Sequence, residues 1–287
     1  MARQLHYRKA IIGEHPVSGH LENKVAIITG AGRGVGLATA ELLAAEGARV
    51  AINDLDQDVA VSAAESVDGA IAVPGSVTDP DFPGQLIQTT LDAFGTIDII
   101  VNNAGYIWNG AMHNHSDEQF QAMLEVHVSA PFRILRSFSD WLRPQAKAEI
   151  NEFGAARCRK VVNVSSVSGT TGSATQVAYS VGKAGVIGLT RTLAKEWGRY
   201  NVTVNSVAFG HIETRLTQAY TDQPPTIEVE GRQHRVGLSE GQVKSVQQAT
   251  PLGRSGRPED AAGAIYLFCI PQSDFITGEV LTCSGGT

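Results

Sequence analysis

Short apolar segments and longer amphipathic segments alternate along most of the chain. The apolar segments, many of them rich in β-branched residues, predict strands at residues 24–29, 49–54, 70–75, 97–103, 160–166, 201–208 and 279–283. The segments between them predict helices at residues 36–46, 56–66, 83–94, 117–142, 177–200 and 258–269. Strands that are apolar on both faces and alternate with helices are typical of a parallel sheet covered on both sides. We therefore expect an α/β fold.

This alternation continues without a break in composition over residues 24–287, so we expect a single domain there. Residues 1–23 mix charge, proline and glycine and lack the apolar core of a secretory signal, which predicts a partly ordered arm. Residues 211–250 are polar and contain two adjacent prolines, which predicts a lid-like excursion, either a functional lid or a solvated loop. Residues 143–159 are expected to form a long connection at which a neighbouring subunit could be met.

Charge and cysteine usage narrow the range of functions. The chain has a net charge of -6 and no run of Lys and Arg, so nucleic acid is not an expected partner. No apolar stretch approaches the ~20 residues that span a bilayer, so we expect no membrane association. The three cysteines lie far apart and outside any CxxC pattern, and the histidines lack metal-ligand spacing. We expect free thiols, no metal and a cytoplasmic location.

A glycine-rich turn follows the first predicted strand. The sequence TGAGRGVG (29–36) places Gly30, Gly34 and Gly36 between a strand and a helix, with Val35 where the fingerprint GxGxxG has its third glycine. Glycines permit a sharp turn and let the backbone approach a pyrophosphate, which the positive end of the next helix attracts. The turn therefore predicts dinucleotide binding.

Asp54 and Arg33 point to different dinucleotides. Asp54 ends the second predicted strand, where a carboxylate can hold both hydroxyls of the adenosine ribose and repel a 2′-phosphate. Arg33 lies in the glycine turn, where a guanidinium could meet that phosphate. We expect NAD(H), because the Asp54 carboxylate would occupy the phosphate position itself, and NADP(H) stays open as the alternative.

Tyr179 and Lys183 lie four positions apart in a predicted helix, so their side chains share one face about one turn apart. A phenol titrates near a pKa of about 10, and a neighbouring cation lowers that pKa. Tyr179 is thus a candidate proton donor or acceptor, and Ser166 can hydrogen-bond a reacting oxygen. Adjacent strand residues face opposite ways, so only one of Ser165 and Ser166 can face such a site.

Several motifs occur together between Lys24 and Gly286: TGAGRGVG (29–36), NNAG (102–105), Ser166, YSVGK (179–183) and the ending ITGEVL…GG (276–286). Their order and spacing resemble the short-chain dehydrogenase/reductase family and, within it, the bacterial 3-oxoacyl-(acyl-carrier-protein) reductases. The resemblance implies a doubly wound, seven-stranded parallel sheet of the Rossmann type. It also implies hydride transfer between a nicotinamide and a hydroxyl or carbonyl carbon, in a homotetramer built on the two long helices.

The resemblance also implies roles for individual residues. Ser166, selected over Ser165 because it lies thirteen positions before Tyr179, would hydrogen-bond the substrate oxygen. Tyr179 would be the general acid or base, and Lys183 would hold the nicotinamide ribose and lower the tyrosine pKa. The expected cofactor-binding residues are Gly30, Arg33, Gly34, Val35, Gly36, Asp54, Ser76, Val77, Asn103, Ala104, Gly105, Tyr179, Lys183, Ile212 and Thr214.

His127 departs from the family pattern. The family usually has asparagine at this position, in a proton relay that reaches the lysine through a water molecule. His127 could serve in such a relay through its backbone carbonyl or its ring, or it could simply pack in the helix. We include it among the catalytic candidates.

The leading hypothesis is an NAD(P)-dependent oxidoreductase acting on a secondary alcohol or ketone, with a 3-oxoacyl thioester as the candidate substrate. Tyr106 and Trp108 could line the pocket or pack in the core, and Arg232 and Arg235 could meet the phosphate of a phosphopantetheine or coenzyme A. One alternative is an NAD-dependent dehydrogenase of another hydroxyl substrate. The other is a non-catalytic dinucleotide-binding regulator, against which the complete set of Ser, Tyr and Lys argues.

Overall fold

The computed structural model describes residues 19–229 and 231–287. The predicted N-terminal arm therefore lies outside the described residues, apart from residues 19–23. This last part is attached to the body, because Leu21 is buried and its backbone N–H donates to the Glu46 carbonyl at 2.9 Å.

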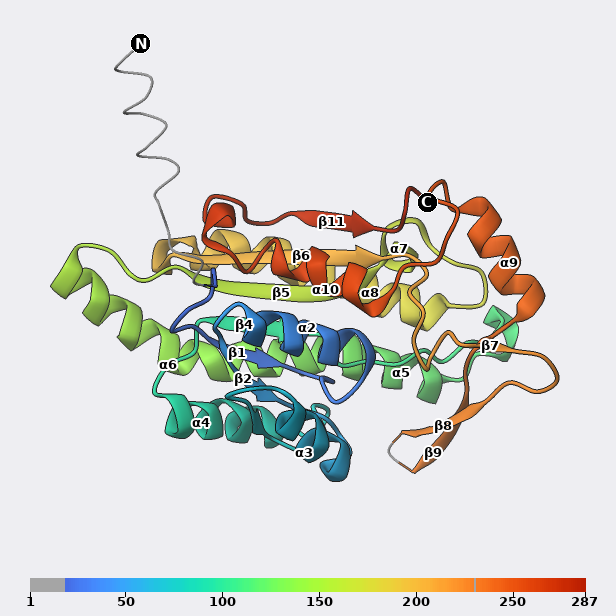
Figure 1. Ribbon diagram of the computed structural model, residues 1–287, viewed down its shortest axis with the longest axis horizontal. Helices are drawn as coiled ribbons and strands as arrows, with labels where there is room; N and C mark the ends of the chain where they lie inside the picture. The colour runs from blue at the N-terminus through green and yellow to red at the C-terminus, as the bar shows by residue number, and fades with distance from the viewer. Residues whose placement is uncertain (1–18, 230) are drawn as a thin grey trace, which may run out of the picture.

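A seven-stranded parallel sheet forms the centre of the molecule (Figure 1). Its strand order is β11-β6-β5-β4-β1-β2-β3, and each neighbouring pair is parallel. The strands are β1 (Val25–Ile28), β2 (Arg49–Ile52), β3 (Ile71–Ala72), β4 (Ile99–Asn102), β5 (Arg159–Ser166), β6 (Val202–Phe209) and β11 (Val280–Cys283). The predicted doubly wound Rossmann sheet is confirmed, and each of the seven predicted strands is present.

Helices cover both faces of this sheet, and a separate apolar core lies under each layer. The helices on one face are α2 (Gly34–Ala45), α3 (Gln57–Ser66) and α10 (Pro258–Tyr266). Those on the other face are α4 (Phe82–Phe94), α6 (Ala130–Phe153) and α8 (Val177–Trp197). The remaining helices are α5 (Asp117–Leu124), α7 (Val167–Thr171) and α9 (Glu240–Ala249). Because both faces are covered, β1, β5 and β6 are buried along their whole lengths.

The direction of winding reverses between β1 and β4. β1 pairs with β2 on one side and with β4 on the other, so the connections that follow β1 and β4 diverge. In open parallel sheets, such a reversal leaves a crevice at the carboxyl ends of the strands, where ligands bind. The topology therefore places the turn after β1 and the segment after β4 on opposite sides of one opening.

The expected connection over residues 143–159 is wrong as far as Phe153, because helix α6 continues to that residue. The buried face of α6 includes Ala146 and Glu149 in this extension. Glu149 accepts two hydrogen bonds from the buried Arg159 guanidinium of β5, at 2.6 and 3.0 Å. The helix thus keeps an inward face that uses a charged pair in place of apolar side chains.

Residues 211–250 fold into regular elements. These are β7 (Ala219–Tyr220), β8 (Thr226–Val229), β9 (Arg232–Arg235), β10 (Leu238–Ser239) and α9. β8 and β9 pair as an antiparallel hairpin, which lies beyond the carboxyl ends of the sheet strands (Figure 1). The solvated-loop hypothesis is wrong for this segment, because Ile227, His234 and Val236 are buried.

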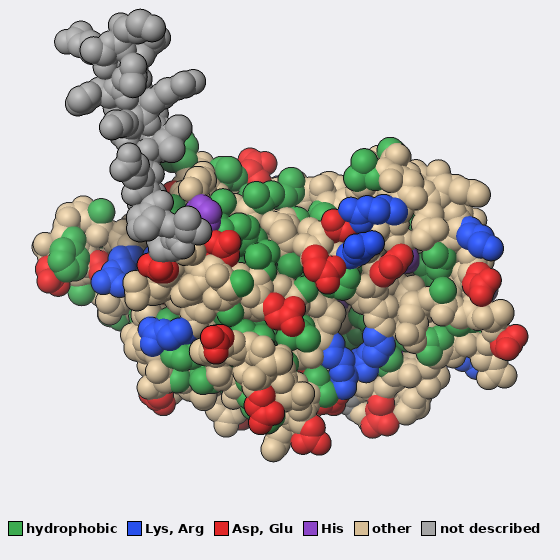
Figure 2. All heavy atoms as spheres, viewed as in Figure 1, with side chains coloured by type: hydrophobic (Ala, Val, Ile, Leu, Met, Phe, Trp, Pro, Cys, Tyr) green, Lys and Arg blue, Asp and Glu red, His purple; other side chains and the backbone are tan. Residues whose placement is uncertain are grey.

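Charged side chains of both signs are interspersed on the face shown in Figure 2. Lys and Arg side chains alternate there with Asp and Glu side chains, with apolar and neutral atoms between them. Among residues 19–229 and 231–287, no helix is at once long enough and apolar enough to cross a bilayer.

Candidate active site

A cavity of about 560 Å³ opens at the carboxyl ends of the strands. Every residue expected from the sequence to act in catalysis or cofactor binding lines it, namely Gly30, Arg33, Gly34, Val35, Gly36, Asp54, Ser76, Val77, Asn103, Ala104, Gly105, His127, Ser166, Tyr179, Lys183, Ile212 and Thr214. The fold therefore brings together residues that are spread over most of the chain. We call the part around the glycine turn the cofactor half, and the part around Tyr106, Ile107 and the β8–β9 hairpin the substrate half.

The glycines of the turn after β1 are required by backbone conformation and by close packing. Gly30 and Gly34 have φ values of +60° and +57°, in the left-handed region that side chains disfavour. A Cβ atom on Gly36 would lie 2.3 Å from the Gly30 carbonyl oxygen. The turn is therefore a concave surface of backbone at the amino end of α2, as a pyrophosphate site requires.

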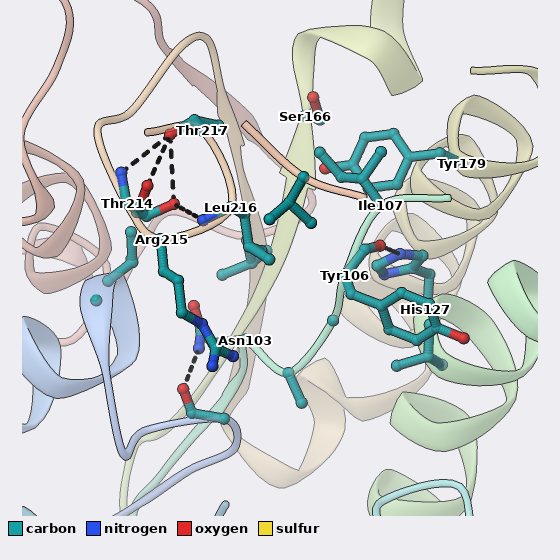
Figure 3. Close-up of a pocket in the computed structure, with 18 of the residues that line it drawn as sticks. Asn103, Tyr106, Ile107, His127, Ser166, Tyr179, Thr214, Arg215, Leu216 and Thr217 are labelled. Atoms are coloured by element: carbon teal, nitrogen blue, oxygen red, sulfur yellow. Dashed lines mark hydrogen bonds between the residues drawn. The ribbon is translucent and has the colours of Figure 1, made fainter. Parts of the chain in front are cut away.

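Asn103 fastens this turn to the end of β4. Its side-chain amide donates to the carbonyls of Thr29 and Gly30, at 2.9 and 3.0 Å. The Thr29 hydroxyl in turn accepts from the backbone N–H groups of Asn103 and Ala104, both at 3.0 Å. These bonds join the two sides of the crevice, and Figure 3 shows one of them at Asn103.

Asp54 lies directly beside the glycine turn. One carboxylate oxygen accepts from the Gly32 N–H at 3.1 Å, and the other accepts from the Asp56 N–H at 3.2 Å. The Arg33 guanidinium forms an ion pair with Asp56 at 3.3 Å, and both side chains are exposed. The carboxylate of Asp54 is thus fixed by backbone, whereas the one ion pair of Arg33 with the described residues is with the solvated carboxylate of Asp56.

Ser165 and Ser166 point in opposite directions at the end of β5. The Ser165 hydroxyl donates to the Lys183 carbonyl at 2.8 Å, in the interior. The Ser166 hydroxyl lines the cavity, where it accepts from the Ser168 N–H at 3.1 Å and donates to the Phe209 carbonyl at 3.3 Å. Ser166 is therefore the serine that faces the site, as the spacing to Tyr179 predicts.

The Tyr179 phenol lies close to Ser166 on the cavity wall (Figure 3). Desolvation raises the pKa of Tyr179 to about 12, and its hydrogen bond with Ser166 offsets only part of that rise. The predicted lowering of the tyrosine pKa by Lys183 is thus not found in the protein by itself. The physical reason is that burial penalises the phenolate and also reduces the charge on Lys183.

Lys183 is one turn from Tyr179 on α8, and it is only 4% exposed. Its ammonium group donates to the Val164 carbonyl at 2.8 Å and lies 5.7 Å from the centre of the Tyr179 ring. Burial lowers the pKa of Lys183 to about 7. An ammonium has three protons to donate, so two remain for a ligand in the cavity.

His127 lies in a π-helical turn, Glu125–Ser129, that separates α5 from α6 within the long helix predicted over residues 117–142. The ring is 3% exposed, and its Nε2 atom lies 2.9 Å from the Tyr106 carbonyl oxygen (Figure 3). It contacts the Tyr179 ring edge to face, with centroids 5.1 Å apart. Burial, assisted by the Lys183 charge, holds the pKa of His127 well below 6.5. The ring is therefore neutral, with Nε2 as the donor.

Two further groups of lining residues are not singled out individually from the sequence, although residues 211–250 are expected to form a lid. One is a hydroxyl and amide cluster in which Ser168 bonds Ser173 at 2.8 Å and Gln176 at 2.9 Å. The other is an apolar wall made by Ile227, Val229, Val236 and Leu238. The alternation of Ile227 and Val229 with polar neighbours is a strand signal that could have identified part of this wall.

The two arginines of the hairpin have different surroundings. Arg232 forms an ion pair with Glu118 of α5 at 2.9 Å, and both side chains are exposed. Arg235 lines the cavity. Of these two arginines, Arg235 is therefore the one placed to meet a charged group of a ligand in this cavity.

The site suits a dinucleotide better than a metal. In the part of the chain that the structure describes, no group of three or more His, Cys, Asp or Glu side chains could hold a metal ion. The glycine turn leaves room that a Cβ atom would fill, and the Asp54 carboxylate lies beside it. A dinucleotide would be held by this turn, with Asp54 at one end and Lys183 at the other.

Comparison with known proteins agrees with this geometry. Residues 30–287 match the family described as enoyl-(acyl carrier protein) reductase. The chain is also similar to proteins named 3-oxoacyl-[acyl-carrier-protein] reductase from Vibrio cholerae, Synechocystis sp. and Thermotoga maritima, at 34, 35 and 33% identity. Each alignment covers 93% of this chain, and 98, 97 and 98% of the respective relative.

The match extends over nearly the whole chain, and the matched range spans the glycine turn, β5 and α8. It confirms the family predicted from the motifs and weighs against the regulator hypothesis. The chain belongs to the short-chain dehydrogenase/reductase family, whose members are oxidoreductases that use a nicotinamide dinucleotide.

Proposed function

We propose that the chain reduces the ketone of a 3-oxoacyl thioester to a secondary alcohol, with NADH as the hydride donor. The observation that carries this proposal is the contact between the Ser166 hydroxyl and the Tyr179 phenol on the wall of the cavity that also contains the glycine turn. Two adjacent hydroxyl donors can bind one carbonyl oxygen, the atom that becomes negatively charged during ketone reduction.

Ketone reduction requires a hydride at carbon and a proton at oxygen. A bound reduced nicotinamide supplies the hydride. The Ser166 hydroxyl rotates from the Phe209 carbonyl to donate its single proton to the substrate oxygen, and Tyr179 transfers its phenolic proton to that oxygen as charge develops there. The resulting phenolate lies near Lys183, and the new negative charge favours the protonated form of that lysine, which stabilises the phenolate until solvent returns the proton. A pKa of about 12 keeps Tyr179 protonated at neutral pH, which is the form that reduction needs.

His127 supports this chemistry by packing against Tyr179. Its neutral ring donates from Nε2 to the Tyr106 carbonyl and packs edge to face against Tyr179. The ring of Tyr179 is therefore kept in place by this contact. This arrangement favours packing over proton transfer by the ring. Participation of the His127 backbone carbonyl in a relay stays a prediction.

The preference for NADH rests on Asp54. Its carboxylate is held against the glycine turn by two backbone N–H groups, so it cannot easily turn away from a ribose 2′-phosphate. Repulsion between the two anions in this position disfavours NADPH. The exposed Arg33, already paired with Asp56, offers limited compensation.

The thioester substrate rests on the names of the relatives and on the character of the substrate half. The apolar wall suits an acyl chain, and Arg235 is placed for a phosphate of a phosphopantetheine or coenzyme A. The family description names enoyl reductases, whose substrates have a C=C bond. Oxidation of another hydroxyl substrate is a second alternative.

The test is a comparison of substrates under one set of conditions. The purified protein is mixed with NADH and either a 3-oxoacyl or a 2-enoyl coenzyme A thioester of equal chain length, and NADH consumption is followed. We expect rapid consumption with the 3-oxoacyl thioester alone. Consumption with the enoyl thioester, or no consumption with the 3-oxoacyl thioester, would overturn the proposal.

We also propose that the chain forms the homotetramer expected from the family. Exposed apolar side chains on the long-helix elements support this, namely Phe120 of α5, Phe132 of α6 and Val181 of α8. The mass in solution, measured by light scattering, tests it. The cytoplasmic location stays a prediction.

A further inference from the structure

The β8–β9 hairpin has an inner and an outer face. In its register, Ile227 pairs with His234 and Glu228 pairs with Gln233. Ile227 and His234 are buried, whereas Glu228 and Gln233 are exposed and bond each other at 3.0 Å. Ile227 and His234 therefore form the inner face. Ile227 lines the cavity, as do Glu228 and Arg235 of the outer face, whereas His234 packs outside the lining.

His234 inserts between two aromatic residues of the segment after β4. Its ring centroid lies 4.9 Å from that of Tyr106 and 4.5 Å from that of Trp108, the latter edge to face. Such pairs stabilise contacts beyond the area that they bury. The second link of the hairpin to the body, the ion pair of Arg232 with Glu118, is exposed on both sides and contributes little. The ring contacts of His234 therefore attach β9 to the body, beside the apolar packing of Ile227 and Val229 of β8.

Burial between these aromatic rings costs free energy, because it removes the His234 ring nitrogens from water. The His234 side chain is 2% exposed, and neither ring nitrogen has a hydrogen-bond partner among the described residues. Burying polar atoms without partners opposes the favourable ring contacts. Burial and the nearby Arg232 lower the pKa of His234, so the neutral ring is the packed form. The favourable ring contacts are thus partly offset by the cost of burying the two nitrogens. Such a weakly held ring suits a hairpin that has to move away when a ligand enters the cavity.

The aromatic segment also leads to the catalytic tyrosine. The Tyr106 carbonyl accepts from His127, and the His127 ring packs on Tyr179. Contacts therefore run without interruption from His234 through Tyr106 and His127 to Tyr179. These contacts offer a packed route along which a change in the position of the hairpin would reach the phenol.

We propose that His234 is a positioning residue, which holds the β8–β9 hairpin closed over the substrate half through Tyr106 and Trp108 and releases it for substrate entry. This rests on the proposed function only for the identity of the substrate. It does not require His234 to touch the substrate, because the ring lies behind the cavity wall.

The experiment compares His234→Ala and His234→Phe with Arg232→Ala as the control on the same strand. Hydrogen exchange of the β8 and β9 amides is measured by mass spectrometry, without substrate. We expect faster exchange in His234→Ala, slower exchange in His234→Phe, whose ring has no polar atoms to bury, and little change in Arg232→Ala. Equal exchange in the wild type and His234→Ala would overturn the proposal.

The kinetic readout separates positioning from general stability. For the ketone substrate, we expect KM to rise about tenfold in His234→Ala and to recover in His234→Phe, with the dissociation constant of NADH unchanged in both. An increase in the NADH dissociation constant equal to that in KM would show a general structural role and contradict the proposal. If the wild type reduces no ketone, the proposed function fails, and the exchange measurement still decides the role of His234.

Discussion

Backbone atoms shape the cofactor half of the cavity, whereas side chains from distant segments shape the substrate half. In the cofactor half, glycines of the β1–α2 turn approach Ala104 closely, and Asn103 bonds the carbonyls of that turn. In the substrate half, the hairpin side chain of His234 meets Tyr106 and Trp108 through ring contacts alone. The comparison teaches that binding of the dinucleotide is built into the sheet, while access of the substrate depends on a separable element.

The largest effect is expected where the two halves meet, at Tyr179. Tyr179→Phe removes the proton donor and keeps the ring, so kcat should fall by roughly 10³-fold. The dissociation constant of NADH should stay within about twofold, because the cofactor half is unaltered. Stopped-flow turnover and fluorescence titration measure the two quantities. A matching loss of NADH binding would mean that the halves are not separable.

The next largest effect concerns the glycine turn. Gly36→Ala places a Cβ atom against the Gly30 carbonyl, so NADH binding should weaken by about 30-fold or more. Gly84→Ala in α4 is the matched control, because a Cβ atom there meets no other atom within 4 Å. Titration with NADH measures the change, and circular dichroism checks the fold. Unchanged binding in Gly36→Ala would show that the turn is not the pyrophosphate site.

Lys183 gives a pH-dependent prediction with a defined sign. Its pKa is lowered from 10.5 to about 7, so the folded state resists the proton that the unfolded state accepts. This opposition to folding is complete below pH 7 and fades as the pH rises from 7 towards 10.5. Lys183→Met should therefore raise the free energy of unfolding by on the order of 2 kcal/mol at pH 6, and by less at pH 9. Urea unfolding at both pH values tests it, and a loss of stability at pH 6 would contradict it.

The smallest effect is expected at Asp54. Asp54→Ser removes the anion that disfavours a 2′-phosphate, so the preference for NADH over NADPH should fall by about tenfold. Adding Arg33→Ala should then weaken NADPH alone, if the guanidinium meets the phosphate. Parallel titrations with both dinucleotides measure the ratio. A wild type that already prefers NADPH would overturn the assignment of Asp54.

The sequence predicts more of the residues of the cofactor half than of the substrate half, for a physical reason. A close backbone turn demands glycine at fixed spacing, and alternation along β5 separates Ser166 from Ser165, so both leave local patterns. His234 depends on Tyr106, which is more than a hundred positions earlier in the chain, and no local pattern records that contact. The extension of α6 depends in the same way on Glu149 meeting Arg159 of β5.

The central claim is hydride transfer to a ketone carbon beside Tyr179, and an isotope measurement tests it most directly. The protein is incubated with a 3-oxoacyl coenzyme A thioester and NADH that carries deuterium at the transferable C4 position. The product is then analysed by mass spectrometry and NMR. The account predicts a 3-hydroxyacyl thioester with deuterium on the carbon that bears the hydroxyl group. Firm binding of NADH without deuterium in any product would contradict it.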